Sequence, residues 1–374
     1  MKIIFCSNNL SGIYLFRKDI LKHYINKGNE VIVIYPKSSN KQIYLEKISR
    51  LCRCIAVDML PNSQNPIIDF KLYKQLKALY KTERPDFVIN FTIKPNIYSA
   101  LAANSLGIKV IDMIAGLGYV FQGNSIKKKL ARLLYKYGLS KAQKVIVLNK
   151  NNYNIIADRY VDRHKLVLFE GGEGVNMNEY PYKENEFKNT RFIMVARLLY
   201  DKGFQQFVDA AKIVKAKYPD ISFELLGGFS EDSPTGVKKE ELQKYINEGI
   251  INYLGRTNDV QSYVLRNGTV VVVASYYMEG MNRALMEACS MGRPIITTDM
   301  PGCREMVDDG VNGYCIEPRN SKALAEACIK FIELPREKKE SMAKASHEKC
   351  KRQFDVALVI KKYDELLSLM HYPK

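Results

Sequence analysis

Short apolar runs alternate, through the first half of the chain, with longer stretches in which apolar residues recur every three or four positions. The runs predict strands at 2–6, 30–35, 85–90, 109–113 and 145–148, and the longer stretches predict helices at 15–27, 72–82 and 96–106. Two of these helices end at a glycine, Gly28 and Gly107, the residue that most often closes a helix. This alternation is typical of a parallel, doubly wound sheet.

The pattern starts again near residue 176 and predicts a second domain of the same kind. Strands are expected at 191–195, 222–226, 251–254, 270–275, 294–298 and 313–316, with a helix at 203–218. A chain of 374 residues is also longer than one core usually organises. We therefore expect two Rossmann-like α/β domains, 1–175 and 176–355, that are joined near 171–182 and face each other across a cleft. A last helix, in 356–374, is expected to pack back on the first domain.

Positive charge is concentrated in the first half of the chain. The net charge is +17, and the residues through 190 hold 30 Lys and Arg against 15 Asp and Glu, whereas the remainder holds 27 against 25. Such asymmetry indicates an anionic partner, which could be nucleic acid, anionic lipid or a phosphorylated acceptor. No nucleic-acid recognition module is visible, so the sequence favours the other two.

The segment 126–144 is the most basic part of this half. Its apolar residues follow helical spacing and are Ile126, Leu130, Leu133, Leu134 and Tyr137. Its cations, which no acid accompanies, are Lys127, Lys128, Lys129, Arg132, Lys136, Lys141 and Lys144. A basic amphipathic helix of this kind predicts binding to an anionic membrane surface. The alternative is a helix packed on the core with a solvated basic face.

Several classes of protein are disfavoured. The longest apolar run, 270–274, is far shorter than the roughly 20 residues of a membrane span. The first strand begins at once, without a signal-peptide pattern, so we expect a cytoplasmic protein. Eight cysteines without a Cys-x-x-Cys motif, and only four histidines, predict reduced thiols rather than a metal framework.

Two glutamates, Glu279 and Glu287, lie between an apolar strand and a helix stop at Gly292. A helix start offers unpaired N–H groups to phosphate, and carboxylates accept hydrogen bonds from hydroxyls. Eight residues of helix span about 12 Å, roughly the reach from the hexose to the ribose of a nucleotide sugar. The pair therefore suits an anionic sugar ligand. The alternative is two solvated acids on an amphipathic helix.

Other strand ends carry polar or glycine-rich turns. Arg197 and Lys202 stand between a strand and a helix, where two cations can hold a diphosphate and stabilise it as a leaving group. The pair Gly227-Gly228 and the residue Arg256 follow two further strands, where backbone can approach a ligand or a base. The first turn contains one glycine, Gly12, and no Gly-x-Gly-x-x-Gly motif, so a dinucleotide site is weakly supported.

Six motifs of the second domain occur in a recognisable order. They are Ala-Arg-x4-Lys-Gly at 196–203, Leu-Gly-Gly at 226–228, Leu-Gly-Arg-x2-Asp-Val at 254–260, Glu-x7-Glu at 279–287, Met-Gly-Arg-Pro-Ile at 291–295 and Pro-Gly-Cys-Arg-Glu at 301–305. Together they resemble the retaining GT-B glycosyltransferases of group 1 (family 4). Segments 91–98 and 114–121 resemble the branch that adds amino sugars or hexoses to polyprenyl-diphosphate-linked glycans. Segment 11–17 resembles bacterial transferases that add N-acetylgalactosamine to such carriers.

The resemblance implies roles for individual residues. Glu279 contacts the hydroxyls of the donor sugar, while Arg197 and Lys202 hold the diphosphate. The other donor-binding residues it implies are Glu287 at the ribose, the backbone of Gly280, Met281 and Asn282, Arg256 near the base, Gly227 and Gly12. On the acceptor side it implies Lys94, Asn96, Gly116, Gly118 and Arg17. One departure is that 91–98 contains none of the histidines that many members carry near the sugar.

The function expected from this resemblance is metal-independent, retaining transfer of a sugar from a UDP-sugar, with no cofactor. The sugar is expected to be an N-acetylhexosamine such as N-acetylgalactosamine. The acceptor is expected to be a polyprenyl-diphosphate-linked saccharide in surface polysaccharide or glycoprotein glycan synthesis, at the inner face of a bacterial membrane. The alternatives are an epimerase or phosphorylase of the same fold, and a non-catalytic subunit that binds glycan or lipid.

Overall fold

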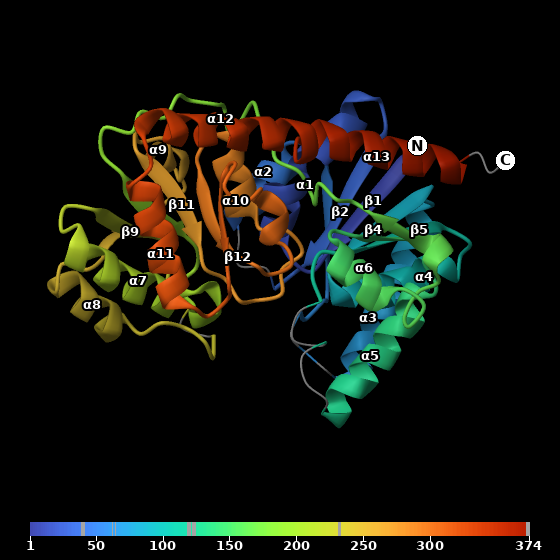
Figure 1. The fold of residues 1–374 in the computed structure, drawn as a ribbon. Coiled ribbons are helices and arrows are strands. Elements are labelled where there is room, and N and C mark those ends of the chain that lie inside the picture. Colours follow the sequence, from blue (N-terminus) through green and yellow to red (C-terminus); the bar gives the residue numbers. More distant parts are fainter. Residues whose placement is uncertain are drawn as a thin grey trace. The chain divides into compact units, whose positions relative to one another are not determined.

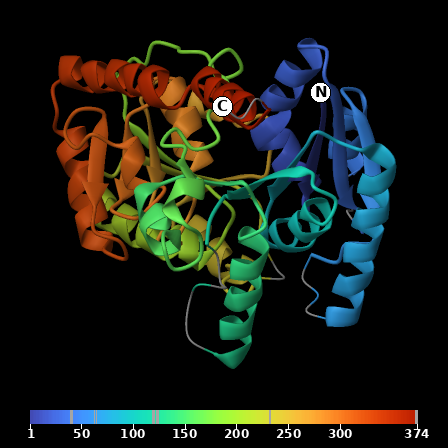
Figure 2. The same ribbon diagram turned by 90° about the vertical axis from the view of Figure 1, so that its right-hand side faces the viewer.

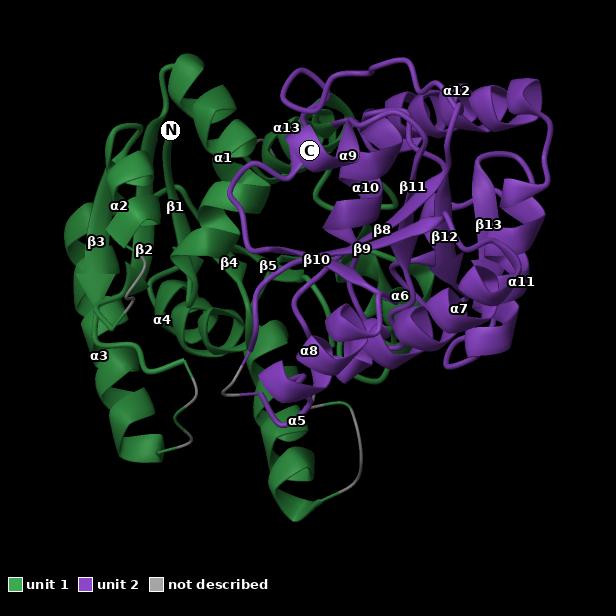
Figure 3. Ribbon diagram, turned by 90° about the vertical axis from the view of Figure 1, so that its left-hand side faces the viewer, with its two compact units in different colours: residues 1–174, 356–374 green, residues 175–355 purple. Residues whose placement is uncertain are grey.

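The computed structural model describes residues 1–38, 42–61, 63, 65–117, 121, 125–230 and 233–371. The chain divides into two compact units, residues 1–174 with 356–374, and residues 175–355 (Figure 3). Each unit contains one sheet whose paired strands are all parallel, with helices on its faces (Figure 1). The predicted pair of doubly wound α/β domains is therefore confirmed.

The sheet of the first unit has the strand order β3-β2-β1-β4-β5-β6-β7. Its strands are β1 Lys2–Ser7, β2 Glu30–Pro36, β3 Arg53–Val57, β4 Phe87–Phe91, β5 Lys109–Ile114, β6 Lys144–Val147 and β7 Leu166–Leu168. Its helices are α1 Leu10–Asn26, α2 Gln42–Ser49, α3 Pro66–Glu83, the π-helix η1 Pro95–Ser99, α4 Ala100–Asn104, α5 Ile126–Leu139, α6 Lys150–Ile156, the 3-10 turn η3 Arg163–Lys165 and α13 Val356–His371.

The sheet of the second unit has the order β10-β9-β8-β11-β12-β13. Its strands are β8 Arg191–Val195, β9 Ser222–Leu226, β10 Asn252–Gly255, β11 Thr269–Val273, β12 Ile295–Thr298 and β13 Gly313–Ile316. Its helices are α7 Phe204–Lys217, α8 Lys239–Asn247, α9 Gln261–Val264, α10 Arg283–Ser290, α11 Ser321–Ile332, α12 Arg336–Gln353 and the 3-10 turns η4 Tyr200–Lys202 and η5 Arg304–Met306.

The central strands are buried along almost their whole length. In β1 every residue after Lys2 is buried, and Ile4 pairs with Ile32 of β2 on one side and Val88 of β4 on the other. β11 is buried throughout. Continuous apolar strands are what a parallel sheet covered by helices on both faces requires, because neither face meets water. This is why the strands were readable from the sequence.

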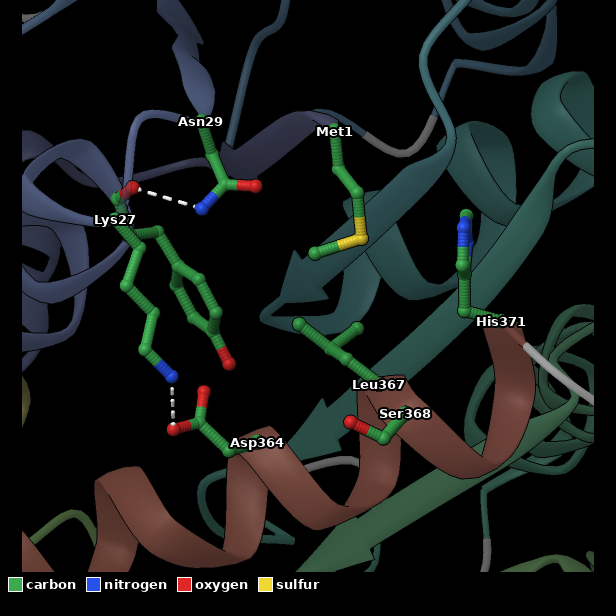
Figure 4. A pocket seen from close by; sticks show the side chains of 8 residues that line it. Met1, Lys27, Asn29, Asp364, Leu367, Ser368 and His371 are labelled. Carbon is green, nitrogen blue, oxygen red and sulfur yellow. Dashed lines mark hydrogen bonds and ion pairs between the residues drawn. The ribbon is translucent and has the colours of Figure 1, made fainter.

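The last helix, α13, belongs to the first unit. The ring of its Tyr363 packs edge-on against Phe169, with centroids 5.2 Å apart. Its Asp364 carboxylate lies 2.7 Å from the Lys27 ammonium and 3.0 Å from Nε2 of His23. A small pocket between α13, the end of α1 and the start of β1 is lined by Met1, Tyr24, Lys27, Asn29, Asp364, Leu367, Ser368 and His371 (Figure 4). None of these residues was predicted to bind a ligand.

Candidate active site

The strand order of the second sheet reverses between β8 and β11. The chain leaves β8 towards β9 on one side, and leaves β11 towards β12 on the other. Ligands of open α/β sheets bind beyond the carboxyl ends of the strands at such a reversal. The turn after β8 carries Arg197 and Lys202, and the turn after β11 carries Glu279. The fold thus brings all three residues predicted as catalytic to the same edge.

Lys202 and Glu279 form an ion pair at this edge. The Lys202 ammonium lies 2.7 Å from Oε1 of Glu279, and the two side chains are 15% and 14% exposed. The ammonium also lies 5.4 Å from the centroid of the Tyr277 ring. A cation suits a phosphate and a carboxylate suits a sugar hydroxyl. The pair therefore presents both kinds of contact side by side.

Asn282 holds this arrangement in place. Its Nδ2 lies 3.1 Å from each carboxylate oxygen of Glu279. Its Oδ1 accepts a hydrogen bond from the Leu285 amide at 3.1 Å and so caps α10. Its own amide donates to the carbonyl of Gly302 at 2.7 Å. That N–H group is thus satisfied within the protein here, and its contact with a ligand stays a prediction.

Gly302 allows the loop after β12 to approach the loop after β11. Its φ is +87°, and a Cβ there would lie 2.9 Å from the carbonyl oxygen of Gly280. The amide of Gly302 donates to Oε2 of Glu305 at 2.8 Å. A side chain at this position would push on the backbone beside Glu279. The glycine in the Pro-Gly-Cys-Arg-Glu motif therefore acts on the site through packing.

Glu287 is paired with Arg283, one turn earlier on α10. Nε of Arg283 lies 2.6 Å from Oε1 of Glu287, and the side chains are 15% and 13% exposed. Burial raises the pKa of the neighbouring Tyr180 to about 12, and the charge of Glu287 adds to the rise. Burial alone would lower the pKa of Arg283, but Glu287 and Tyr180 outweigh it and raise the pKa. The sequence interpretation missed Arg283, although the i, i+4 spacing of opposite charges was visible.

Two further predicted cations lie at strand ends. Arg197 is exposed, and its guanidinium forms no ion pair or hydrogen bond within the part of the chain that the structure describes. Arg256 is also exposed, beside Gly228. Gly227 is closely packed, because a Cβ there would lie 1.7 Å from the carbonyl oxygen of Ala196, and its contact with a ligand stays a prediction. Its absent side chain makes room for protein backbone.

Arg17, predicted on the acceptor side, is buried in the first unit. It is 4% exposed and forms an ion pair with the buried Glu173. Its Nη1 donates to the carbonyl oxygen of Gly12 at 2.8 Å, and its guanidinium lies 4.1 Å from the centre of the Phe91 ring. These contacts are those of a residue that ties the start of α1 to its surroundings. Contact of Arg17 with an acceptor stays a prediction.

Lys94 and Asn96 are buried as well. Lys94 pairs with Asp69, which also accepts a hydrogen bond from the Tyr98 hydroxyl at 3.0 Å. Asn96 donates to the carbonyl oxygen of Met113 at 2.9 Å. Of the two predicted glycines, Gly116 is half-buried after β5, and Gly118 lies outside the described residues. Lys94 and Asn96 are thus held inside the first unit near the carboxyl edge of its sheet, and their contact with an acceptor stays a prediction.

No group of three or more His, Cys, Asp or Glu side chains among the described residues could hold a metal ion. No helix in the part of the chain that the structure describes is long and apolar enough to cross a bilayer.

Comparison with known proteins gives consistent matches over both units. Residues 177–349 match the family model of glycosyl transferases group 1, and residues 2–149 match the model of glycosyl transferase 4-like proteins. The chain is 28% identical over 352 residues to N,N'-diacetylbacillosaminyl-diphospho-undecaprenol alpha-1,3-N-acetylgalactosaminyltransferase of Campylobacter jejuni, covering 89% of this chain and 90% of that one. It is 25% identical to UDP-Gal:alpha-D-GlcNAc-diphosphoundecaprenol alpha-1,3-galactosyltransferase of Escherichia coli, covering 87% and 85%.

Solved structures show the same fold. A glycosyltransferase from Rickettsia africae superposes with a TM-score of 0.82 at 18% identity, covering 100% of this chain and 99% of that one. Anabaena HepE, solved in complex with UDP, gives 0.78 at 18% identity, covering 98% and 100%. Because the two family models together span both units and whole-chain relatives are glycosyltransferases, the chain belongs to the group 1 glycosyltransferases with the GT-B fold.

Proposed function

We propose that the chain is a retaining transferase that moves an N-acetylhexosamine, such as N-acetylgalactosamine, from a UDP-sugar to a polyprenyl-diphosphate-linked saccharide. The product would enter surface polysaccharide or glycoprotein glycan synthesis. The observation that carries the proposal is the Lys202–Glu279 pair at the strand reversal, because it joins a phosphate ligand to a hydroxyl ligand. The Campylobacter and Escherichia relatives, named for diphospho-undecaprenol saccharides, support the acceptor class.

The second unit would bind the donor. Lys202 and the exposed Arg197 would neutralise the diphosphate, so that the bond between the anomeric carbon and the phosphate oxygen can break. Glu279, oriented by Asn282, would accept hydrogen bonds from the sugar hydroxyls. Glu287 and Arg283 would lie at the ribose end of the site. Charge neutralisation by two side chains is the reason to propose transfer without a metal ion or other cofactor.

Retention of configuration follows from attack on the face that the phosphate leaves. The acceptor hydroxyl forms the new bond to the anomeric carbon, and its proton passes to the departing diphosphate oxygen. No histidine lies in 91–98, and this route needs no separate strong base. Both relatives are named for alpha-1,3 linkages. An alpha product from an alpha-linked UDP-sugar is the outcome of a retaining transfer.

The first unit would hold the acceptor and place the enzyme at the inner face of the membrane. The excess of Lys and Arg through residue 190 supports an anionic surface as its partner. The basic segment 126–144, which contains helix α5, is the predicted contact. Peripheral binding of this kind needs an amphipathic surface with cations rather than a spanning helix.

The experiment that tests the donor site is a thermal-shift measurement with UDP, GDP, ADP and their sugars. A ligand that binds only the folded state raises its melting temperature. At a concentration near 100 times its Kd, UDP is expected to raise the melting temperature by about 5–10 °C. GDP and ADP are expected to give much smaller shifts. A melting temperature that no nucleotide changes would contradict a preformed donor site.

A transfer assay then separates the sugars and the reaction types. With a polyprenyl-diphosphate-linked saccharide as acceptor, UDP-N-acetylgalactosamine is expected to give more product than UDP-galactose. Release of UDP without any acceptor would indicate epimerase chemistry, and dependence on phosphate would indicate a phosphorylase. Binding of UDP without transfer to any lipid acceptor would indicate a non-catalytic subunit.

Asn282 is expected to act as a positioning residue. Asn282→Asp keeps a cap oxygen for α10 but replaces the amide that holds Glu279 with a second negative charge. We expect its melting temperature to stay near wild type, while kcat/KM falls about 10-fold, as loss of one hydrogen bond to a charged group predicts. Asn282→Ala removes the cap as well and should also lose about 1 kcal/mol of stability. Equal kinetics of Asn282→Asp and wild type would show that Asn282 acts on the helix alone.

A further inference from the structure

Helix α5 leaves most of its apolar face exposed. The exposed fractions are 84% for Ile126, 67% for Leu130, 64% for Leu133, 38% for Leu134 and 53% for Tyr137. Only Tyr135, Gly138 and Leu139 of this helix are buried. The alternative of a helix whose apolar face packs on the core is therefore wrong.

The cause lies in how α5 is attached. A Cβ on Gly138 would lie 2.7 Å from the carbonyl oxygen of Asn96, so the end of α5 is pressed against η1. The Tyr135 hydroxyl lies 3.0 Å from Nδ2 of Asn96, one turn earlier. The first turns project from the unit (Figure 1). The exposed apolar side chains thus lie mainly on the projecting part.

The first turns of α3 also expose apolar side chains, although fewer than α5 does. Ile67 is 66% exposed and Phe70 is 55% exposed, and their spacing places them on one face of the helix. The Lys74 ammonium lies 4.7 Å from the centroid of the Phe70 ring, and Lys71 is exposed. The acid of the first turn, Asp69, is buried. Apolar and cationic side chains therefore gather here too.

Both helices start at the same edge of the first sheet. Helix α3 follows β3 and α5 follows β5, and all paired strands of this sheet are parallel. Helices that return antiparallel to such strands begin at the carboxyl edge, which is where ligands bind. Figures 2 and 3 show the first turns of α3 and α5 projecting on the same side of the unit. The loops after β4 and β5, with Lys94 and Gly116, follow strands that end at this edge.

We propose that the first turns of α3 and α5 form one docking surface for an anionic lipid bilayer. It is made of Ile67, Phe70, Lys71 and Lys74 on α3, and of Ile126, Leu130, Leu133, Lys127 and Lys129 on α5. Its apolar side chains enter the boundary between headgroups and acyl chains, and its lysines contact anionic headgroups. Two separate points of contact fix the tilt of the unit, which a single helix could not do.

A bilayer fits this surface better than a protein partner of the same kind. The exposed lysines would repel those of a second copy, whereas they attract anionic lipid. The inference rests on the proposed function in one respect, which is that the acceptor is itself anchored in a bilayer. The docking surface then brings the acceptor-side edge of the sheet to the plane in which the diphosphate headgroup lies.

The test is co-sedimentation of the full chain with vesicles of phosphatidylcholine alone, or with about one third phosphatidylglycerol. Wild type is expected to bind the anionic vesicles and to be released by salt. The variants Ile67→Glu/Phe70→Glu and Leu130→Glu/Leu133→Glu are each expected to reduce binding about 10-fold. The matched control is Leu358→Glu/Leu369→Glu, which changes two exposed apolar residues of α13, a helix of the same unit outside the docking surface. It should bind as wild type does.

Three outcomes would overturn the proposal. The first is that wild type does not bind anionic vesicles. The second is that the α3 variant binds them as well as wild type does. The third is that wild type is a dimer in solution and that the glutamate variants dissociate it. The UDP thermal shift, measured on the same variants, reports the second unit and should be unchanged. Failure of the UDP shift in wild type would contradict the proposed donor site without affecting vesicle binding, so the two failures are distinguishable.

Discussion

Lys202→Ala and Glu279→Ala are each expected to lose most turnover, about 100- to 1,000-fold in kcat, while the chain stays folded. In the proposed site Lys202 would stabilise the diphosphate as negative charge develops on it, and a neutral side chain could not replace this. Glu279 would hold the sugar hydroxyls, and its loss would free the sugar to rotate away from the acceptor. Both side chains are partly exposed, so neither substitution leaves a fully buried charge without a partner. The measurement is steady-state transfer from UDP-sugar to the lipid-linked acceptor.

The second unit offers a matched control for the lysine. Lys217 and Glu333 also form an ion pair at 2.7 Å, but their side chains are 58% and 51% exposed. Lys217→Ala is therefore expected to keep wild-type kcat and a melting temperature close to that of wild type, because exposed ion pairs contribute little to stability. Near-wild-type rates in both Lys202→Ala and Glu279→Ala would rule out this assignment of the site. Loss of activity in Lys217→Ala to the same extent would show that the assay reports folding.

The sequence predicted the strands better than the helices, for a physical reason. Strands buried on both faces are continuous apolar runs, and β8, β9 and β13 were predicted with their observed bounds. Helix α12 was missed because its buried face includes Lys339, Ser346 and Lys349, which hide the apolar period. Helix α3 begins at Pro66, six residues before the predicted start. The signal was present, since Asn65 caps the helix and proline is favoured in its first turn.

The residues of the candidate site also differ in how far the sequence could predict their positions and contacts. Arg197, Lys202 and Glu279 were predictable because motif order and strand ends locate them without knowledge of contacts. The buried pairs of Arg17 with Glu173 and of Lys94 with Asp69 were not, because each partner is distant in the sequence. From sequence alone, a charged residue beside a predicted ligand loop is predicted to contact the ligand, because its partner within the protein is not known. The hydrogen bond from Asn282 to Glu279 depends on side-chain orientation, which sequence spacing does not predict.

Gly227→Ala is expected to destabilise the second unit by more than about 3 kcal/mol. A Cβ on Gly227 would lie 1.7 Å from the carbonyl oxygen of Ala196, so backbone must move. The Gly227 amide donates to the carbonyl of Gly255 at 2.9 Å, and its carbonyl accepts from the Tyr253 hydroxyl at 2.9 Å. Both hydrogen bonds resist that movement. The melting temperature should fall by about 6–12 °C, measured by circular dichroism.

The neighbouring glycine separates this packing effect from ligand binding. A Cβ on Gly228 would come nearest to the side chain of Arg256, whose Cδ would lie 3.1 Å away. Because Arg256 is exposed, it can move, and Gly228→Ala should cost less than about 1 kcal/mol. If Arg256 lies near the base, the displaced guanidinium should raise KM for the UDP-sugar while kcat is kept. If the Gly227→Ala protein has the same melting temperature as wild type, then the end of β9 and the turn after β8 can move apart without loss of stability. The position of Arg197 and Lys202 would then not depend on that contact.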